Sequence, residues 1–233
     1  MGLYLSLIMM QFGVVIRLGK TTLSDERKKN IIKENIGRII IFCEGPTEKY
    51  YLDYFANIIN KSKYTDVHIE TESANGNAKT VLNFAEKFLS QEENNRKYVN
   101  YGKSLIFDCD APKNIQNVIN EMQASDKKFT LLVSNYLFEL WLLMHFEIVD
   151  KKLTKRKIYE KLSGHLVNDY IKADSGVIRE IIANGSVEDA IKNAFNLVQL
   201  YESDGKTIEK NIIEMNPYTN VYKLIEQFMM EIS

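Results

Sequence analysis

The chain has 233 residues, of which 45% are hydrophobic and 26% charged, with 30 Lys and Arg residues against 31 Asp and Glu residues. This composition is typical of a folded protein and excludes a disordered chain and a uniformly basic nucleic-acid packaging protein. The two cysteines, Cys43 and Cys109, are too few for a disulfide framework or a zinc finger, so we expect a cytoplasmic protein with reduced thiols.

Two apolar segments resemble membrane or targeting signals only superficially. Residues 3–16 follow no basic region and are too short for a spanning helix, which needs about 20 apolar residues. Residues 131–149 are long enough, but they contain Glu139 and Glu147, and a carboxylate is costly in the middle of a membrane. We therefore expect no membrane association and interpret the second segment as a buried strand followed by a buried helix.

In chain order, residues 20–37 are polar and charged, which predicts a solvated arm or a helix before the main fold. Short β-branched and aromatic runs then predict buried strands at residues 38–43, 67–71, 103–107 and 129–133. Amphipathic or apolar segments between and after them predict helices at residues 49–59, 79–91, 112–124 and 136–146, the last capped by Ser134 or Asn135. After residue 150 only helices are expected, at residues 155–162, 174–183, 187–202 and 221–231.

Strands that alternate with helices of this length indicate α/β units and a mainly parallel sheet. The predicted fold is therefore α/β, with a four-stranded sheet flanked by helices and a helical C-terminal half. We divide the chain into an N-terminal arm (residues 1–37), an α/β core (38–150) and a helical extension packed on the core (151–233).

Acidic residues stand where two of the predicted strands end. Glu44 follows the first strand, and Asp108 and Asp110 follow the third. Ligands of open parallel sheets bind outside the carboxyl ends of the strands, and alternate residues of an extended segment point to the same side. Carboxylates that converge there favour a hard divalent cation such as Mg²⁺ or Mn²⁺. The alternative for each acid alone is a solvated loop residue or a helix cap.

Glu139 is the only Asp, Glu, Lys or Arg between Lys128 and Glu147, in an otherwise apolar helix. A buried, unpaired carboxylate costs several kcal/mol, so this side chain should be paired, protonated or bound to a metal ion. We favour a metal ligand over a salt bridge. His145, six positions later, is either a core histidine with one satisfied nitrogen or a contact to a nucleic-acid substrate.

Residues 150–172 contain seven Lys and Arg residues but three Asp and Glu residues, with Tyr159 and Tyr170 between them. This composition is compatible with phosphate binding and base stacking. The candidate nucleic-acid contacts here are Lys151, Lys152, Lys155, Arg156, Lys157 and Lys172. A solvated helix face is the alternative.

The sequence resembles the RloB family, which is also represented by AbiL-type phage-resistance proteins, and more broadly the Toprim-fold nucleases. The matching stretches are residues 41–48 (IFCEGPTE), 107–110 (FDCD), 134–146 (SNYLFELWLLMHF), 170–172 (YIK) and 216–221 (NPYTNV). The likeness covers about residues 38–231, and FELWLLMHF is its most specific part. At Tyr136-Leu137 the chain departs from the Asn-Pro and variable residue that we expect of the family, so the loop before Glu139 can differ.

The resemblance implies a Toprim-like sheet and a Toprim-like catalytic centre. In that centre Glu44 is a general acid/base or a metal ligand, and Asp108 and Asp110 are metal ligands. Glu48 and Glu139 complete the site for Mg²⁺ or Mn²⁺, and Lys172 stabilises the phosphate.

The implied activity is a metal-dependent endonuclease that cuts DNA or RNA in anti-phage defence by abortive infection. An ABC- or AAA-type ATPase is the implied partner, and a homo-oligomer is compatible with the sequence. The alternative is a Toprim-like subunit without catalytic activity that binds nucleic acid or regulates an ATPase complex.

Overall fold

The structure is a computed structural model, and it describes residues 36–61, 66–110 and 112–232. Most of the predicted arm, residues 1–37, and the apolar segment at residues 3–16 lie outside the described residues. The first half of the fold contains β1 (Arg38–Cys43), α3 (Pro46–Ile59), β2 (His68–Ser73), α4 (Ala78–Ser90), α5 (Glu92–Tyr98), β3 (Gly102–Asp108), α6 (Pro112–Ala124), β4 (Thr130–Asn135) and α7 (Glu139–Leu143). The second half contains α8 (Lys155–His165), α9 (Ser175–Asn184), α10 (Val187–Ser203), α11 (Ile208–Asn211), β5 (Tyr218–Thr219) and α12 (Tyr222–Ile232).

These strands form one sheet in the order β2-β1-β3-β4-β5, in which the first four strands are parallel and β5 is antiparallel to β4. The α/β class, the mainly parallel sheet and the helical C-terminal part are therefore confirmed. The four predicted strands are present, and β5 is a fifth strand that the sequence analysis did not predict. From Ile39 onward β1 is buried, which explains why its sequence is a continuous apolar run.

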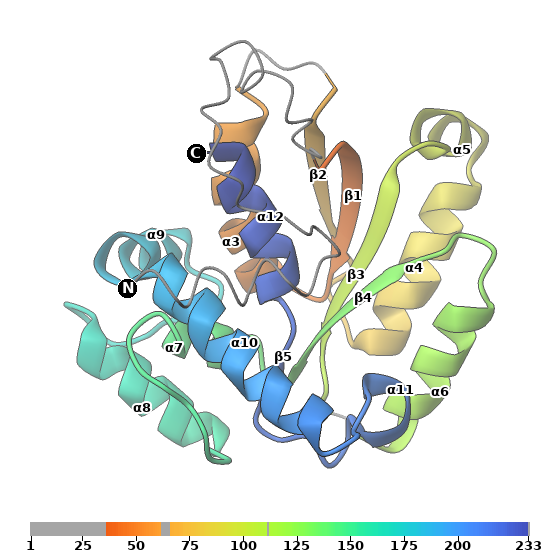
Figure 1. The fold of residues 1–233 in the computed structure, drawn as a ribbon. Coiled ribbons are helices and arrows are strands. Elements are labelled where there is room, and N and C mark those ends of the chain that lie inside the picture. The colour runs from red at the N-terminus through yellow and green to blue at the C-terminus, as the bar shows by residue number, and fades with distance from the viewer. Residues whose placement is uncertain (1–35, 62–65, 111, 233) are drawn as a thin grey trace, which may run out of the picture. The chain divides into compact units, whose positions relative to one another are not determined.

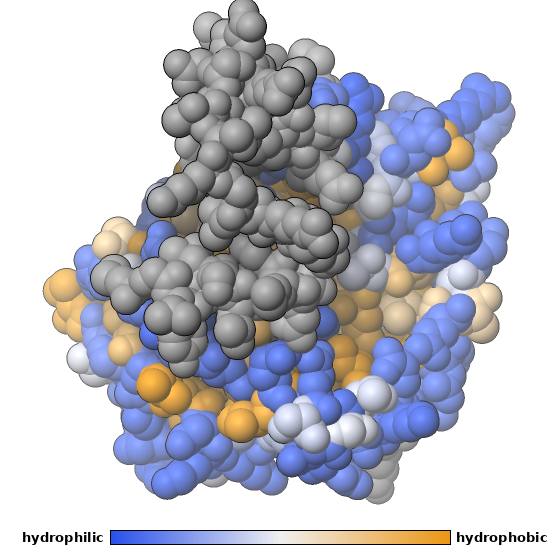
Figure 2. Space-filling view, in the orientation of Figure 1, coloured by the Kyte–Doolittle hydropathy of each residue, from blue (hydrophilic) through white to orange (hydrophobic). Residues whose placement is uncertain are grey.

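Helices cover both faces of the sheet (Figure 1). Helices α4 and α6 pack against each other on one face, where α4 contacts β1 and β3. Helix α3 contacts β1 and β2 on the other face and packs against α12. On the face shown in Figure 2, hydrophilic residues cover most of the outer helices, and apolar residues appear in smaller areas between them.

The C-terminal part of the chain contributes directly to the sheet. Strand β5 extends the sheet beyond β4, and the side chain of Asn220 continues the pairing along the β4 backbone. Its Oδ1 accepts from the Val133 backbone N at 2.7 Å, and its Nδ2 donates to the Leu131 carbonyl at 3.0 Å. The division of the chain at residue 150 stays a prediction.

The segment between β4 and α7 differs from the expected one. Ser134 and Asn135 are the last residues of β4 and not helix caps, so that prediction is wrong. The Ser134 hydroxyl contacts the Thr219 hydroxyl at 3.0 Å, and Asn135 Nδ2 donates to the Ile212 carbonyl at 2.6 Å. Because these side chains bond to the C-terminal part of the chain, the strand continues and the helix begins later, at Glu139.

The apolar stretch at residues 131–149 is a buried strand followed by a short buried helix, as predicted. Within the described part of the chain, no helix has both the length and the apolar character needed to cross a membrane.

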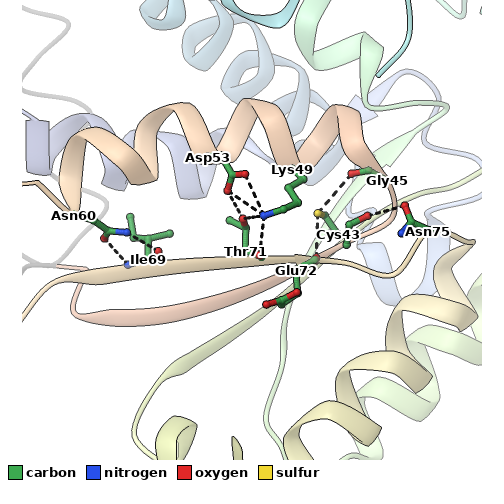
Figure 3. A network of polar contacts seen from close by, with 10 residues as sticks. Cys43, Gly45, Lys49, Asp53, Asn60, Ile69, Thr71, Glu72 and Asn75 are labelled. Atoms are coloured by element: carbon green, nitrogen blue, oxygen red, sulfur yellow. Dashed lines mark hydrogen bonds and ion pairs between the residues drawn. The ribbon is translucent and has the colours of Figure 1, made fainter. Parts of the chain in front are cut away.

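Side chains of α3 bond to the backbone of the edge strand β2 (Figure 3). Asn60, which follows the last residue of α3, donates to the Ile69 carbonyl and accepts from the Ile69 backbone N, both at 2.8 Å. Lys49 Nζ donates to the Thr71 carbonyl at 2.9 Å and pairs with Asp53 at 3.1 Å. Unpaired groups on an edge strand invite pairing with another chain, so these contacts protect β2 from aggregation.

Candidate metal centre

Glu44 and Asp108 lie beside each other at the carboxyl end of the two central strands. Glu44 directly follows β1, Asp108 is the last residue of β3, and the two strands are neighbours in the sheet. The Asp108 backbone N donates to Glu44 Oε2 at 3.0 Å. The parallel topology therefore brings together two acids that are 64 residues apart in the sequence.

The first turn of α3 brings Glu48 back toward Glu44. Gly45 is the N-cap of α3, Pro46 is its first residue, and Glu48 Oε2 accepts from the Gly45 backbone N at 3.1 Å. A Cβ atom at position 45 would lie 3.3 Å from Glu48 Oε2, so a residue with a side chain would crowd this carboxylate and glycine does not. Glu48 is buried, and the motif that begins with Glu44 is therefore a helix start that turns two acids toward one region.

Glu139, the first residue of α7, is fully buried, and its two carboxylate oxygens have different surroundings. The hydroxyls of Tyr159 and Tyr170 both donate to Oε1, each at 3.1 Å. Lys172 Nζ lies 3.7 Å from the same oxygen. Oε2 is buried and has no hydrogen-bond partner among the described residues.

Electrostatic interactions join these acids into one group, which we call the acidic cluster and define as Glu44, Glu48, Asp108 and Glu139. Burial raises the pKa of Asp108 well above its ordinary range, and the charges of Glu48, Glu139 and Glu44 raise it further. Burial raises the pKa of Glu48 too, and Glu139 adds to this increase. Burial also raises the pKa of Glu44 to about 7, although the hydrogen bond from the Asp108 backbone opposes the shift.

Asp110 is exposed and stands at the edge of this group. With Asp108 it lines a cavity of about 260 Å³, whose other walls are the start of α4 and one side of α6. Its charge contributes to the raised pKa of Glu44. Asp108 and Asp110 therefore share one cavity.

Lys172 extends toward the acidic cluster from the segment between α8 and α9, with 43% of its side chain exposed. Burial lowers its pKa, but the carboxylates of Glu139, Asp108 and Glu48 outweigh that effect and raise it overall. Its neighbour Ala173 donates its backbone N to Thr47 Oγ1 at 3.1 Å, which ties this segment to the first turn of α3.

The donor set of the acidic cluster fits Mg²⁺ or Mn²⁺, because it offers hard carboxylate oxygens and a buried oxygen of Glu139 without a partner. The cluster is not assembled around an ion: in the described residues no group of three or more His, Cys, Asp and Glu side chains is arranged to hold one. Glu44, Glu48 and Glu139 each accept a hydrogen bond on one carboxylate oxygen. The metal roles stay predictions.

His145 is buried and belongs to the core. Its Nε2 is 2.9 Å from the Tyr51 hydroxyl, its ring packs edge-on against Tyr51 and Trp141, and its Nδ1 has no described partner. Burial lowers its pKa to about 4. The side chain offers a nucleic acid no surface in this structure, and the core alternative accounts for its contacts.

The other candidate nucleic-acid contacts are exposed. Lys151 and Lys152 precede α8, and Lys155, Arg156 and Lys157 form its first turn. Arg156 and Lys157 pair with Glu160 at 3.3 and 3.4 Å, as expected of a solvated helix face. Lys155 Nζ lies over the ring of Tyr159, 5.6 Å from its centroid. Because the Tyr159 hydroxyl bonds to Glu139, Tyr159 connects the basic first turn of α8 to the acidic cluster. A role in nucleic-acid binding stays a prediction.

The sequence analysis missed the relation of Tyr159 and Tyr170 to Glu139. Their position in a basic segment suggested base stacking, but both hydroxyls bond to the buried carboxylate, and the two rings contact each other with centroids 4.9 Å apart. The sequence gives one indication of such a contact: a buried carboxylate without a local partner needs a hydrogen-bond donor from a distant part of the chain.

Comparison with known proteins gave one match. A search of curated proteins and a search of solved structures found no protein similar to this chain. The sequence model of the RloB-like protein family matches residues 39–228, which include the whole acidic cluster. Because the match covers most of the chain, the protein belongs to the RloB-like protein family.

Proposed function

We propose that this protein is a Mg²⁺- or Mn²⁺-dependent phosphodiesterase, a nuclease that cuts DNA or RNA. The observation that carries the proposal is the acidic cluster at the carboxyl ends of parallel strands, together with the buried Glu139 oxygen to which no residue in the described part of the chain bonds. Such an oxygen is expensive to bury unless it receives a cation or a proton. Glu44, Glu48, Asp108, Asp110 and Glu139 are the residues that would hold the ion.

The bound ion supplies activation of water and stabilisation of the charge that develops on the leaving oxygen. In the metal-free protein burial raises the pKa of Glu44 to about 7, and in the loaded site Glu44 would act as a ligand of the ion or as the general acid/base. Lys172, charged and partly exposed beside the cluster, is placed to bind a phosphate oxygen of the substrate. The basic first turn of α8 would bind the phosphates that follow.

The biological setting that we propose is defence against phages, with an ABC- or AAA-type ATPase as partner. This part rests on the membership of the RloB-like family and on the likeness to AbiL-type and Toprim-fold nucleases described above. The resemblance of the centre to the Toprim site, with Glu44 as its glutamate and Asp108 and Asp110 as its DxD pair, is part of the same proposal.

Incubation of the purified chain with end-labelled single- and double-stranded RNA and DNA tests the activity. We expect cleavage with Mn²⁺ or Mg²⁺, none with EDTA, and none with the Asp108→Ala variant. Asp126→Ala is the matched control, because Asp126 is an exposed aspartate whose ion pair is with Lys127. Cleavage by Asp108→Ala at the wild-type rate would show that Asp108 is not part of the catalytic site.

A second candidate function is a subunit without nuclease activity that binds nucleic acid or regulates an ATPase. One observation favours it: Lys172 forms an ion pair with Glu139 at 3.7 Å, as in the salt-bridge alternative for this residue. The two candidates differ in Mn²⁺ binding. Calorimetry that detects no Mn²⁺ binding to a folded wild-type chain would support the regulatory subunit.

A further inference from the structure

Among the described residues, Lys172 is a cation whose charge acts on each member of the acidic cluster. Its ammonium group lies 3.7 Å from Glu139 Oε1. Its charge also opposes the increase in the pKa of Glu44, Glu48 and Asp108. The ammonium group therefore contacts one carboxylate of the cluster, Glu139, and acts on the other three through its charge.

The chain on both sides of Lys172 is fixed to the protein. Tyr170 is buried, its hydroxyl bonds to Glu139, and its backbone N donates to Ser163 Oγ at 2.8 Å. Ala173 bonds to Thr47 and has φ = +59°, in the left-handed region that residues other than glycine rarely adopt. The segment that carries Lys172 is thus fixed beside the cluster, while the Lys172 side chain itself is 43% exposed.

The contacts of Glu139 differ from those of a completed structural ion pair. Three partners share Oε1, while Oε2 is buried and none of the described residues bonds to it. The tyrosine hydroxyls orient the carboxylate but add no positive charge. Hydrogen bonds fix the position of this carboxylate through Oε1, and Oε2 remains available to a ligand. A divalent cation would offset the charge of the buried group better than the single charge of Lys172 does.

We propose that Lys172 takes the place of the metal ion in the metal-free protein, and that Mg²⁺ or Mn²⁺ displaces its ammonium group when it binds to the acidic cluster. The inference rests on the proposed metal centre. It adds that Lys172 and the ion compete for the same carboxylates. Once displaced, the ammonium group is free for a phosphate oxygen, so ion binding prepares the site for an anionic substrate.

Calorimetric titration of the full-length, EDTA-stripped chain with Mn²⁺ tests the competition. Lys172→Met removes the competing charge and should bind Mn²⁺ about tenfold more tightly than the wild type, which corresponds to about 1.4 kcal/mol. Lys172→Arg keeps the charge and should bind with nearly the wild-type affinity. Lys161→Met is the matched control, because Lys161 pairs with Glu147 at 2.6 Å and leaves the cluster unchanged.

Thermal unfolding gives a second measurement that does not depend on activity. Without metal, Lys172→Met should unfold at a lower temperature than the wild type, because the carboxylates lose their cation. Saturating Mn²⁺ should raise its melting temperature by more than it raises that of the wild type. Should Lys172→Met not fold without metal, Lys172→Gln provides the same comparison.

The outcomes separate this inference from the proposed function. Equal or weaker Mn²⁺ binding by Lys172→Met, with binding by the wild type intact, would overturn the competition and leave the metal centre standing. If neither protein binds Mn²⁺, the metal centre itself fails. Tighter binding in Lys172→Met but not in Lys172→Arg or Lys161→Met would support the inference.

Discussion

The hydroxyl of Tyr170 donates to Oε1 of Glu139 at 3.1 Å across a separation of 31 residues. Tyr170 lies in the helical C-terminal part of the chain, and Glu139 begins the short helix that follows the fourth strand. One carboxylate of the acidic cluster is therefore positioned by the part of the chain outside the predicted α/β core.

Tyr170→Phe should lower Mn²⁺ affinity by about tenfold, because Glu139 loses a donor that orients its carboxylate. The free energy of unfolding should fall by about 1 kcal/mol for the lost hydrogen bond. Calorimetry and urea unfolding measure the two effects. Tyr98→Phe removes a similar bond, from Tyr98 to Glu70 at 2.7 Å, and should reduce stability without a change in Mn²⁺ affinity. Equal Mn²⁺ affinity in both variants would make the Tyr170 contact a purely structural one.

Glu139→Gln keeps the volume of the side chain and an acceptor for the two tyrosine hydroxyls, but removes the charge. The protein should fold, and Mn²⁺ binding in calorimetry should weaken by about 100-fold or more, because an ionised oxygen ligand is lost. Glu147→Gln, which breaks only the exposed contacts with Lys161 and His165, is the control. Unchanged affinity in Glu139→Gln would make Glu139 a structural ion-pair residue.

Asp108→Asn should stabilise the metal-free protein at pH 8 by on the order of 1 kcal/mol, because it removes one of several like charges in a buried group. The same substitution should abolish the stabilisation that Mn²⁺ gives the wild type. Urea unfolding in EDTA and in Mn²⁺ measures both effects. A variant less stable than the wild type in EDTA would mean that the Asp108 charge has a favourable partner in the folded protein.

The contribution of Glu44 to the stability of the metal-free protein should fall as the pH rises from about 4.5 to 7. The pKa of Glu44 is 4.5 ordinarily and about 7 when folded, so in this range the folded state keeps a proton that the unfolded state has released. The contribution is at most about 3 kcal/mol and is smaller after screening, because Glu44 is only half-buried. His145 acts in the opposite direction, since its pKa falls to about 4 on folding and stability drops as the pH falls below about 6.5.

Comparison of the wild type with Glu44→Gln in EDTA isolates the Glu44 effect, because His145 is common to both proteins. The stability of Glu44→Gln relative to the wild type should increase with pH and level off above about pH 7. A difference that does not change between pH 5 and pH 8 would contradict the raised pKa.

The first four strands could be predicted because each is a short apolar run bounded by polar residues. The acids at their ends could be predicted to meet because parallel strands share one carboxyl edge, as Glu44 and Asp108 do. Strand β5 could not be predicted, because two residues, Tyr218–Thr219, show no periodicity and their pairing depends on Asn135 and Ser134. Helix α5, with the polar sequence EENNRKY, has no apolar face that would indicate a helix.

Glu139 could be identified as unusual from its apolar neighbours, but its partners could not. Tyr159 and Tyr170 are 20 and 31 residues away in the sequence, and no local pattern gives the direction in which their hydroxyls point. The sequence alone leaves His145 as a core residue or a contact to the substrate. Its burial depends on packing against Tyr51 and Trp141, which no local sequence pattern reveals.

The late position of β5 has a consequence for synthesis on the ribosome. Asn220, which bonds to the edge of β4, is made 87 residues after Val133, which takes roughly 4 to 17 s at about 5–20 residues per second. During that time the edge of β4 is open in the nascent chain, and for part of it Glu139 lacks Tyr159, Tyr170 and Lys172. The acids are thus made before their counter-charge, because Lys172 follows Glu139 by 33 residues, and a chain that stops between the two carries the acids without the segment that organises them.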